Sequence, residues 1–501
     1  MTHLIKYGCL ALAFASLWAM PGQAQTENVV GDVNAYRRNH VRQTLKRAWD
    51  AYMEHAAGYD ELLPVSRGAV NNLSVTPVDA LDSLWMMGLK REFQEACNIV
   101  AKIDFSKASE PVSFFETGIR VLGGLLSAHE MSGNWMLLEK AVEIGDLLLI
   151  AFDTPTGFPK SRLDLSKKLA YGTRVLLAEV GTIQLEFAKL SQFTRNPKYD
   201  RAAQRVIHRL DRLRTDYPGL IPAHLDAESG QAMSDLYTFG AMGDSYYEYL
   251  IKYAVLTDRK HGLHGQMYTK AINSMKLVML TTAANHPDDW YLPELHGNRV
   301  DSRMHHLTCF APGMLALGSH FLGVRDDMDV AKQLMKTCIK FYRNTATGLG
   351  PESVKFNLAL AFDGTPESNG TAALAAGELT TVEVADYRDR GYTVDNRSYQ
   401  LRPETIESLL YLYRLTGNPI YQSMGWDAYK ALERFTRAPA GYATIKDVET
   451  ARRRDNQYDA MPSFFLAETL KYLFLLFSDK DVYSLDDYVF NTEAHPFKII
   501  R

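Results

Sequence analysis

Two carboxylates at the start of one apolar helix could perform acid–base chemistry. The run from Leu401 to Tyr413 places Pro403 before Glu404 and Glu407, and leucines follow in the next turns. Proline suits the first helical position, where no backbone N–H is required, and a spacing of three puts both acids on one face, one turn apart. A favourable pairing of acids with the positive helix N-terminus is the alternative explanation.

A second candidate group lies on a helix predicted near residue 116. Glu116 and Arg120 are four residues apart, which is also the spacing of an ordinary surface ion pair. Gly123 and Gly124 follow them, and a glycine costs about 1 kcal/mol in a helix interior. We therefore expect this helix to pack closely against another backbone or to leave room for a ligand.

Two further helices carry acids among aromatic residues. Asp244 and Glu248 are four apart, a spacing at which like charges repel, and three tyrosines occupy the same turns. Glu468 lies close to Phe464 in an otherwise apolar helix, where a glutamate is either paired or functional. Aromatic faces beside carboxylates suit sugar rings, although aromatic residues that pack a helix interface are the commoner explanation.

Motifs of several other chemistries are missing from the sequence. It contains no GxSxG, no HExxH, no phosphate-binding glycine loop and no CxxC pair. Several acids, few histidines and no obvious nucleophile favour general acid and base catalysis on a neutral substrate. Glycoside hydrolysis is the commonest reaction of this kind.

Helices must position these acids, because apolar residues recur at three- and four-residue spacing almost throughout the chain past residue 30. We expect an all-α fold with about fourteen helices. The predicted segments are 34–57, 76–89, 91–104, 111–132, 134–152, 173–193, 197–215, 240–258, 260–284, 303–322, 326–347, 402–417, 419–437 and 461–478. A long loop over 348–400 could hold short strands at 380–384.

The candidate acids fall on every second predicted helix. Glu116, Asp244, Glu404 and Glu468 lie on the fourth, eighth, twelfth and fourteenth segments. Alternate helices of an up-down array are parallel, so acids near their first turns would gather at one end of a ring.

The first residues of the chain differ from the rest. Met1 to Lys6 carries one lysine, residues 7–20 form a mostly apolar stretch of 14, and small residues follow up to Ala24. This pattern is typical of a cleaved secretory signal, and the stretch is shorter than the ~20 residues that cross a bilayer. We expect a signal peptide over 1–24, one domain over 25–501 with no membrane span, and a periplasmic or secreted location.

Charge and cysteine content limit the partners and the compartment. The chain has 501 residues and a net charge of −4, which becomes −5 when the signal and its single lysine are removed. A mildly acidic surface argues against nucleic acid or anionic lipid as a partner. Cys97, Cys309 and Cys338 remain after cleavage, and two of the three could pair in an oxidising compartment.

Eight stretches of the sequence together resemble glycoside hydrolase family 47, the class I α-1,2-mannosidases. They run in the family's order over nearly the whole mature chain: Val78–Trp85, Phe115–Ser127, Ala178–Phe187, Asp244–Lys252, His306–Phe310, Leu401–Thr416, Ser463–Phe477 and Val489–Pro496. The resemblance implies an (α/α)7 barrel plugged from one end by a C-terminal β-hairpin. With the signal pattern, it suggests a secreted, bacterial member.

The resemblance also implies a reaction and the residues that perform it. The reaction is the inverting hydrolysis of terminal α-1,2-linked mannose from oligomannose glycans, with Glu404 as general base. Glu116 is the general acid, and Asp244 competes for that role. The residues that match sugar-binding positions are Arg120, Glu179, His306, Arg402, Glu407, Phe464, Glu468 and Glu493.

A bound Ca2+ and a disulfide are further implications of the resemblance. Thr492 matches the residue that binds the ion through its hydroxyl and carbonyl oxygens. Cys309 and Cys338 match a cysteine pair of the family, which leaves Cys97 as a buried free thiol. We expect the protein to act as a monomer.

Two alternatives and one departure from the family pattern stand beside this interpretation. Relatives of the family act as mannose-recognising lectins, and other α/α barrels, such as sugar epimerases, use a catalytic histidine pair. Retention of Glu116, Asp244, Glu404 and Thr492 favours the enzyme. Met242 stands where endoplasmic-reticulum members carry arginine and Golgi members leucine, which leaves the linkage preference open.

Overall fold

The computed structural model describes residues 32–71, 73–284, 286–356, 381–452 and 455–501. The predicted signal peptide at 1–24 lies outside the described residues.

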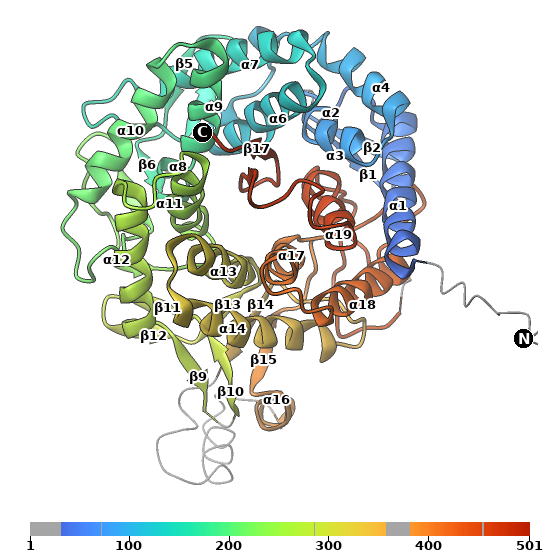
Figure 1. Cartoon of the computed structure of the whole chain (residues 1–501). Coiled ribbons are helices and arrows are strands. Elements are labelled where there is room, and N and C mark those ends of the chain that lie inside the picture. The colour runs from blue at the N-terminus through green and yellow to red at the C-terminus, as the bar shows by residue number, and fades with distance from the viewer. Residues whose placement is uncertain (1–31, 72, 285, 357–380, 453–454) are drawn as a thin grey trace, which may run out of the picture.

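Helices form two concentric rings (Figure 1). The inner ring contains α3 (Leu81–Met86), α6 (Gly123–Ser132), α9 (Gln184–Thr194), α11 (Asp244–Leu256), α13 (Ala311–Leu322), α17 (Glu404–Thr416) and α19 (Leu470–Leu476). The outer ring contains α1 (Val33–His55), α4 (Lys90–Val100), α7 (Trp135–Leu148), α10 (Lys198–Asp211), α12 (Leu263–Val278), α14 (Arg325–Arg343) and α18 (Ile420–Phe435). Each of the fourteen predicted segments overlaps one of these helices to within one residue at either end or encloses it, and every second helix is inner. The prediction of an all-α (α/α)7 barrel is confirmed.

Short helical segments precede or follow several of the long helices. They are α2 (Val75–Asp79), η1 (Phe105–Lys107), α5 (Phe114–Glu116), η2 (Thr117–Leu122), η3 (Leu149–Phe152), α8 (Leu177–Val180), η4 (His306–Phe310) and η6 (Phe465–Thr469). Two of them, η2 and η6, are π-helical, with a wider turn than the α-helix that follows. Such turns occur frequently at functional sites because they displace side chains from the regular helical positions.

Small antiparallel sheets occupy the connections between helices. In the described residues, the two-stranded sheets pair β1 (Glu61–Leu63) with β2 (Gly68–Val70), β6 (Arg174–Leu176) with β7 (His224–Asp226), β9 (Thr281–Ala283) with β10 (His286–Tyr291), and β16 (Tyr488–Phe490) with β17 (Pro496–Lys498). The three-stranded sheets have β4 (Arg162–Asp164) between β3 (Val112–Ser113) and β5 (Leu169–Tyr171), β11 (Glu294–His296) between β8 (Leu236–Tyr237) and β12 (Arg299–Asp301), and β14 (Ser353–Phe356) between β13 (Arg303–His305) and β15 (Tyr392–Asn396).

The prediction of short strands at 380–384 is wrong where the structure describes that segment. Residues Thr381–Arg390 form a helix, α16, which ends at Gly391 with a positive φ of 81°. Four β-branched residues, Thr380, Thr381, Val382 and Val384, favoured a strand, but the segment continues with helix-compatible residues to a glycine helix stop. Strands do form on either side, at 353–356 and 392–396.

The β16–β17 hairpin enters the middle of the inner ring (Figure 1). Its turn packs against Gly123, where an added Cβ would lie 2.7 Å from the side-chain nitrogen Nδ2 of Asn491. An added Cβ at Gly124 would lie 2.7 Å from the carbonyl oxygen of Val78. The two glycines therefore allow the close packing that their position in a helix predicted.

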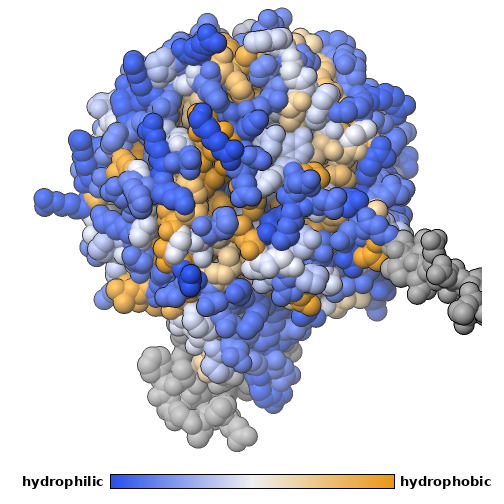
Figure 2. Space-filling view, in the orientation of Figure 1, coloured by the Kyte–Doolittle hydropathy of each residue, from blue (hydrophilic) through white to orange (hydrophobic). Residues whose placement is uncertain are grey.

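The disulfide between Cys309 and Cys338 is present and joins η4 to α14, and Cys97 is a buried free cysteine, both as predicted. None of the helices in the described residues is long and apolar enough to cross a membrane. Figure 2 shows the same face as Figure 1, with hydrophilic residues over most of the rim and apolar residues gathered nearer the middle.

Candidate active site

A cavity of about 300 Å3 opens at the end of the barrel where the inner helices begin. Eleven of the predicted site residues line it: Glu116, Arg120, Glu179, Asp244, Arg402, Glu404, Glu407, Phe464, Glu468, Thr492 and Glu493. Because they come from alternate helices and from the hairpin turn, the parallel inner helices do gather them at one end of the ring. His306 does not line the cavity.

Unusual backbone conformations occur beside the cavity. Arg120 lies in the π-helical η2, and Glu468 lies in the π-helical η6. Met242, Leu401 and Ala494 have φ angles of 79°, 61° and 60°. Residues other than glycine rarely adopt positive φ, and such strain clusters at functional sites.

Arg120 connects the acids on one side of the cavity. Its guanidinium lies 2.6 Å from a Glu116 carboxylate oxygen and 2.6 Å from one of Glu493. Arg402 on the other side pairs with Glu352, at 2.8–3.0 Å, through two of its nitrogens. Both guanidiniums lie over the ring of Phe464, at 5.4 and 5.9 Å from its centre. Phe464 therefore fixes two cations whose planar groups can bind hydroxyl oxygens.

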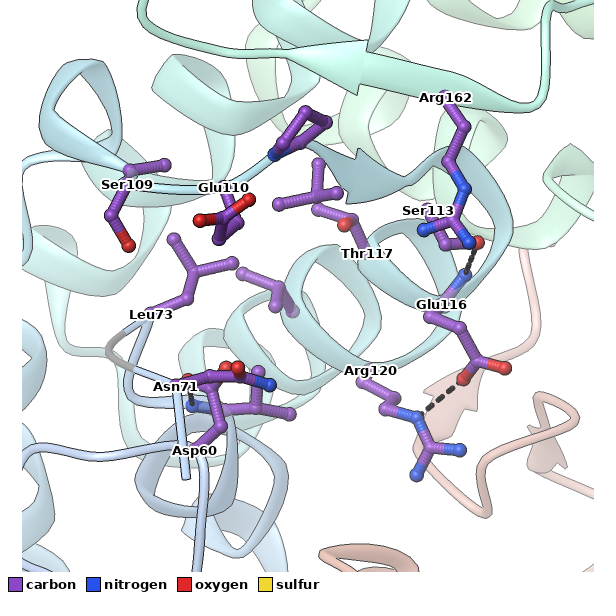
Figure 3. A pocket seen from close by; sticks show the side chains of 15 residues that line it. Asp60, Asn71, Leu73, Ser109, Glu110, Ser113, Glu116, Thr117, Arg120 and Arg162 are labelled. Atoms are coloured by element: carbon purple, nitrogen blue, oxygen red, sulfur yellow. Dashed lines mark hydrogen bonds and ion pairs between the residues drawn. The ribbon is translucent and has the colours of Figure 1, made fainter. Parts of the chain in front are cut away.

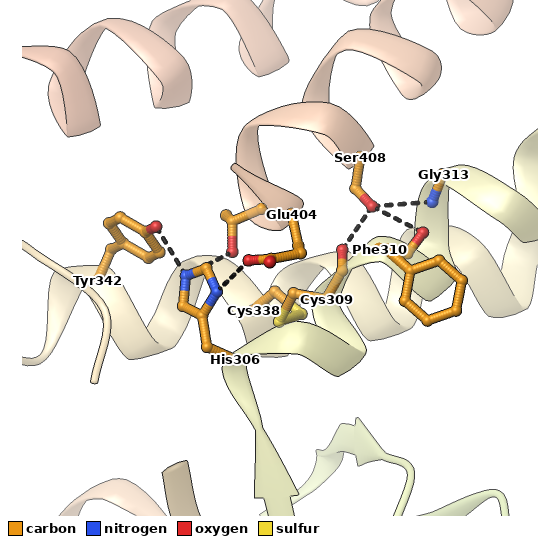
Figure 4. Close-up of a disulfide and its surroundings, with 9 residues drawn as sticks. His306, Cys309, Phe310, Gly313, Cys338, Tyr342, Glu404 and Ser408 are labelled. Atoms are coloured by element: carbon orange, nitrogen blue, oxygen red, sulfur yellow. Dashed lines mark hydrogen bonds and ion pairs between the residues drawn. A yellow bond between two sulfur atoms is a disulfide. The ribbon is translucent and has the colours of Figure 1, made fainter. Parts of the chain in front are cut away.

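His306 lies behind Glu404 rather than in the cavity (Figure 4). Its ring is 1% exposed, with Nδ1 at 2.7 Å from a Glu404 carboxylate oxygen and Nε2 at 2.8 Å from the Tyr342 hydroxyl. We expected His306 to bind sugar; the structure places its ring against the Glu404 carboxylate and does not include it in the lining of the cavity. A histidine held on both ring nitrogens positions its partner rather than binding a ligand.

Two carboxyl groups in the cavity are driven towards opposite protonation states. Burial, with the charges of Glu248 and Glu404, raises the pKa of Asp244 to about 7. Burial would also raise the pKa of Glu404, but the hydrogen bond and charge of His306, with Arg402, outweigh it and lower that pKa. Such a pair supplies a proton donor and a proton acceptor in one site.

The remaining acids outnumber the cations near them. Eight lining residues carry carboxyl groups, and two are arginines. Lys252, buried behind the cavity, contacts Glu248 and Glu407. Burial still raises the pKa of Glu407 to about 8 and the pKa values of Glu468 and Glu493 well above the ordinary range. The site therefore favours additional positive charge.

Thr492 offers oxygen atoms to such a charge. Its amide donates to the Tyr249 hydroxyl at 3.3 Å, and its hydroxyl and carbonyl oxygens accept no hydrogen bond from the residues that the structure describes. Two free oxygens among carboxylates fit Ca2+, which prefers six to eight oxygen ligands in irregular geometry. Glu294, His296 and Asp301 of β11 and β12 also lie within reach of one ion, but none of them lines this cavity.

Buried polar residues that the sequence analysis did not assign to the site hold the hairpin turn. His495 contacts Asp82 at 2.8 Å and Asp79 at 3.1 Å. Glu186 accepts hydrogen bonds from Tyr249, at 2.6 Å, and from Asn491, at 2.8 Å. Glu186 and Lys252 are charged residues inside apolar helices, and that pattern could have identified them.

Comparison with known proteins agrees with this geometry. The model of the family described as glycosyl hydrolase family 47 matches residues 44–499. The chain belongs to glycosyl hydrolase family 47. Membership makes it a glycoside hydrolase and disfavours the alternative of a sugar epimerase.

Relatives in the family share most of the chain. The sequence is 41% identical to mannosyl-oligosaccharide 1,2-alpha-mannosidase MNS1 of Arabidopsis thaliana, over 93% of this chain and 80% of that protein. It is 39% identical to the endoplasmic reticulum mannosyl-oligosaccharide 1,2-alpha-mannosidase of Homo sapiens, over 95% of this chain and 66% of that protein. The solved structure of an alpha-1,2-mannosidase from Trichoderma reesei superposes with a TM-score of 0.86 at 29% identity, covering 93% and 99% of the two chains.

Proposed function

We propose that this family 47 hydrolase is an exo-acting α-1,2-mannosidase that removes terminal mannose from oligomannose glycans with inversion and with a bound Ca2+. The observation that carries the proposal is the pairing, in one cavity, of Glu404 with a lowered pKa and Asp244 with a pKa of about 7. The names of the relatives support the substrate.

Glu404 is the general base in this mechanism. It is ionised at neutral pH and oriented by His306, so it can take a proton from the water that attacks the sugar's anomeric carbon. The C–O bond to the leaving sugar breaks as the bond to water forms on the opposite face, and the product is β-mannose. Inversion requires space for that water between the two carboxyl groups.

A second carboxyl group protonates the departing glycosidic oxygen. Asp244 holds a proton up to about pH 7, which suits this role. Glu116 is the other candidate: its side chain is 49% exposed and paired with Arg120, at the edge of the cavity. The family resemblance favours Glu116 as the general acid. The buried position of the Asp244 carboxyl, which raises its pKa, favours Asp244 instead.

Thr492 and the surrounding carboxylates would hold the ion. When bound, Ca2+ would supply positive charge to oxygen atoms of the substrate and stabilise charge as the reaction proceeds. Arg120, Arg402 and Phe464 bind and orient the sugar.

A lectin-like protein with little hydrolysis is the alternative, and the retention of an ionised base beside a protonated acid disfavours it. We also propose that the protein is a monomer, of bacterial origin, exported to the periplasm or the medium. The Cys309–Cys338 disulfide supports export, because disulfides persist in oxidising compartments.

One assay tests the function: incubation of the protein with α-1,2-linked mannobiose, followed by NMR. We expect mannose to appear first as the β-anomer. Binding of the disaccharide without any release of mannose would favour the lectin. Fresh α-mannose in the first minutes would contradict inversion.

A further inference from the structure

Three potential metal ligands meet on the β11–β12 hairpin, outside the active-site cavity. Glu294, His296 and Asp301 each offer one ligand atom, and these atoms all lie within 4.8 Å of one another. None of the three lines the cavity that contains Glu404 and Thr492. An ion bound by the hairpin would therefore occupy a site separate from the one proposed at Thr492.

The pairing of the two strands explains why these side chains meet. Glu294 lies directly opposite Asp301 in the antiparallel register, and His296 lies opposite Arg299. Glu294 and His296 are two residues apart and point to the same face of the strand, a face that a directly opposite residue shares. Leu295, between them, points to the other face and is buried. The hairpin thus presents two carboxylates and an imidazole on one face.

No lysine or arginine offsets the charges of these carboxylates within the residues that the structure describes. Glu116 shows the usual arrangement, since its carboxylate pairs with the Arg120 guanidinium at 2.6 Å (Figure 3). Asp301 instead accepts only the backbone N–H of Arg303, at 3.2 Å, and Glu294 forms no ion pair with a described residue. Like charges directly opposite each other destabilise a sheet. The pair therefore favours a bound cation.

Glu294 is the member whose surroundings point most directly to a cation. The residue is more than nine-tenths buried, with 8% of its surface exposed. One carboxylate oxygen accepts a hydrogen bond from the Thr238 hydroxyl at 3.1 Å, and the other oxygen has no partner among the described residues. Burial of a carboxylate without a compensating partner is costly. The ring of His296 also forms no hydrogen bond with the described residues, so it is available as a ligand.

The ligand types select a transition metal rather than Ca2+. Imidazole nitrogen suits Zn2+, Fe2+ and Ni2+, whereas Ca2+ takes oxygen ligands. Zn2+ binds nitrogen and carboxylate oxygen together, commonly from three protein residues with water in the remaining position. We propose that Glu294, His296 and Asp301 form a second metal site, which binds Zn2+ or a similar divalent transition metal. This inference does not depend on the proposed function.

Hydrogen bonds connect this site to the segment that carries Asp244. The Thr238 hydroxyl, which donates to Glu294, accepts the backbone N–H of Gly240 at 2.9 Å. The backbone N–H of Asp244 in turn donates to the Gly240 carbonyl oxygen at 3.1 Å. An ion on Glu294 therefore stabilises the segment before α11, and its role is structural, since none of its ligands lines the active-site cavity.

Titration of the whole chain with Zn2+ tests the inference. Calorimetry would measure Zn2+ binding in excess Ca2+, which fills sites that offer oxygen alone. We expect one Zn2+ per chain that Ca2+ does not displace. His296→Ala and Asp301→Asn should each weaken it by at least ~10-fold, because even residues that only orient a metal ligand contribute about 10–100-fold. Zn2+ should also raise the Tm of the wild-type protein and not that of His296→Ala.

His261→Ala, which removes an exposed histidine, is the matched control and should bind Zn2+ like the wild-type protein. Thr492→Ala should also keep full Zn2+ affinity. Circular dichroism without Zn2+ checks that each variant is folded, and if Asp301→Asn is not, His296→Ala decides. The inference is overturned by a wild-type protein that binds no Zn2+, by equal affinity in the wild type and His296→Ala, or by loss of Zn2+ binding in Thr492→Ala.

Discussion

His306 Nδ1 lies 2.7 Å from a carboxylate oxygen of Glu404, and the same ring is held from behind by the Tyr342 hydroxyl (Figure 4). Tyr342 belongs to the outer helix α14, and Glu404 opens the inner helix α17. The candidate base is therefore oriented across both rings of the barrel.

His306→Gln should shift the acid limb of the pH–rate profile. The His306 hydrogen bond and charge lower the pKa of Glu404, so their loss should raise it, and activity at low pH should fall about tenfold. Activity between pH 6 and 7 should fall less. Tyr342→Phe removes only the outer contact and is the control. An unmoved acid limb in the His306 variant would mean that the ring has a purely structural role.

Glu404→Gln should lose at least ~10²-fold in kcat, the low end for removal of a general base. The amide keeps the size of the side chain, so mannoside binding should persist. The measurement is initial-rate kinetics with a parallel binding assay. Near-normal turnover would remove Glu404 from the mechanism.

The alkaline limb of the pH–rate profile identifies the acid. The pKa of Asp244 is raised to about 7, so its proton is present below that pH and lost above it. If Asp244 is the acid, activity should fall above about pH 7. Asp244→Asn should then abolish turnover at every pH. If Glu116→Gln abolishes turnover while Asp244→Asn retains it, Glu116 is the acid.

Removal of the disulfide should destabilise the fold. A cross-link with a sequence separation of 29 restricts the unfolded chain by about 3–4 kcal/mol. Cys309→Ser with Cys338→Ser should therefore unfold at lower urea concentration, and Cys97→Ser is the control. Thiol titration of the denatured, unreduced mature protein should find one free thiol, and three would disprove the cross-link.

Chelation should abolish activity without unfolding the helices. Eight carboxyl groups and two arginines line the cavity, so added Ca2+ should bind and restore turnover. Thr492→Ala removes the free hydroxyl and should weaken Ca2+ binding measured by calorimetry, while Thr436→Ala, at a buried threonine outside the cavity, is the control. Full activity after exhaustive chelation, with no metal detectable, would show that activity does not depend on Ca2+.

Helix periodicity was sufficient to predict the two rings. Each helix has an apolar face, and the spacing of its apolar residues can be seen within one segment of the sequence. The sequence alone therefore placed Glu116, Asp244, Glu404 and Glu468 on alternate helices. Apart from the C-terminal hairpin, which the family resemblance implied, the short strands were not predicted, because two to six residues show too little alternation.

Partners distant in sequence were also not predictable. Arg402 pairs with Glu352, and His495 pairs with Asp79, across separations of 50 and 416 residues. Such pairs depend on closure of the ring rather than on local pattern. The contacts of His306 with Glu404 and Tyr342 have the same origin, since these residues are 98 and 36 positions away in the sequence.

The ring closes between α1 and α19, and Arg38 on α1 donates to the carbonyl oxygen of Phe477 across 439 residues at 2.7 Å. The active-site cavity lies across this seam, because Glu116 and Arg120 come from one side of it and Glu468 and Thr492 from the other. A folding chain therefore exposes an open, partly apolar arc until α19 and the hairpin turn with Thr492 are in place. Any chain that ends before Thr492 therefore has both an open barrel and an incomplete site.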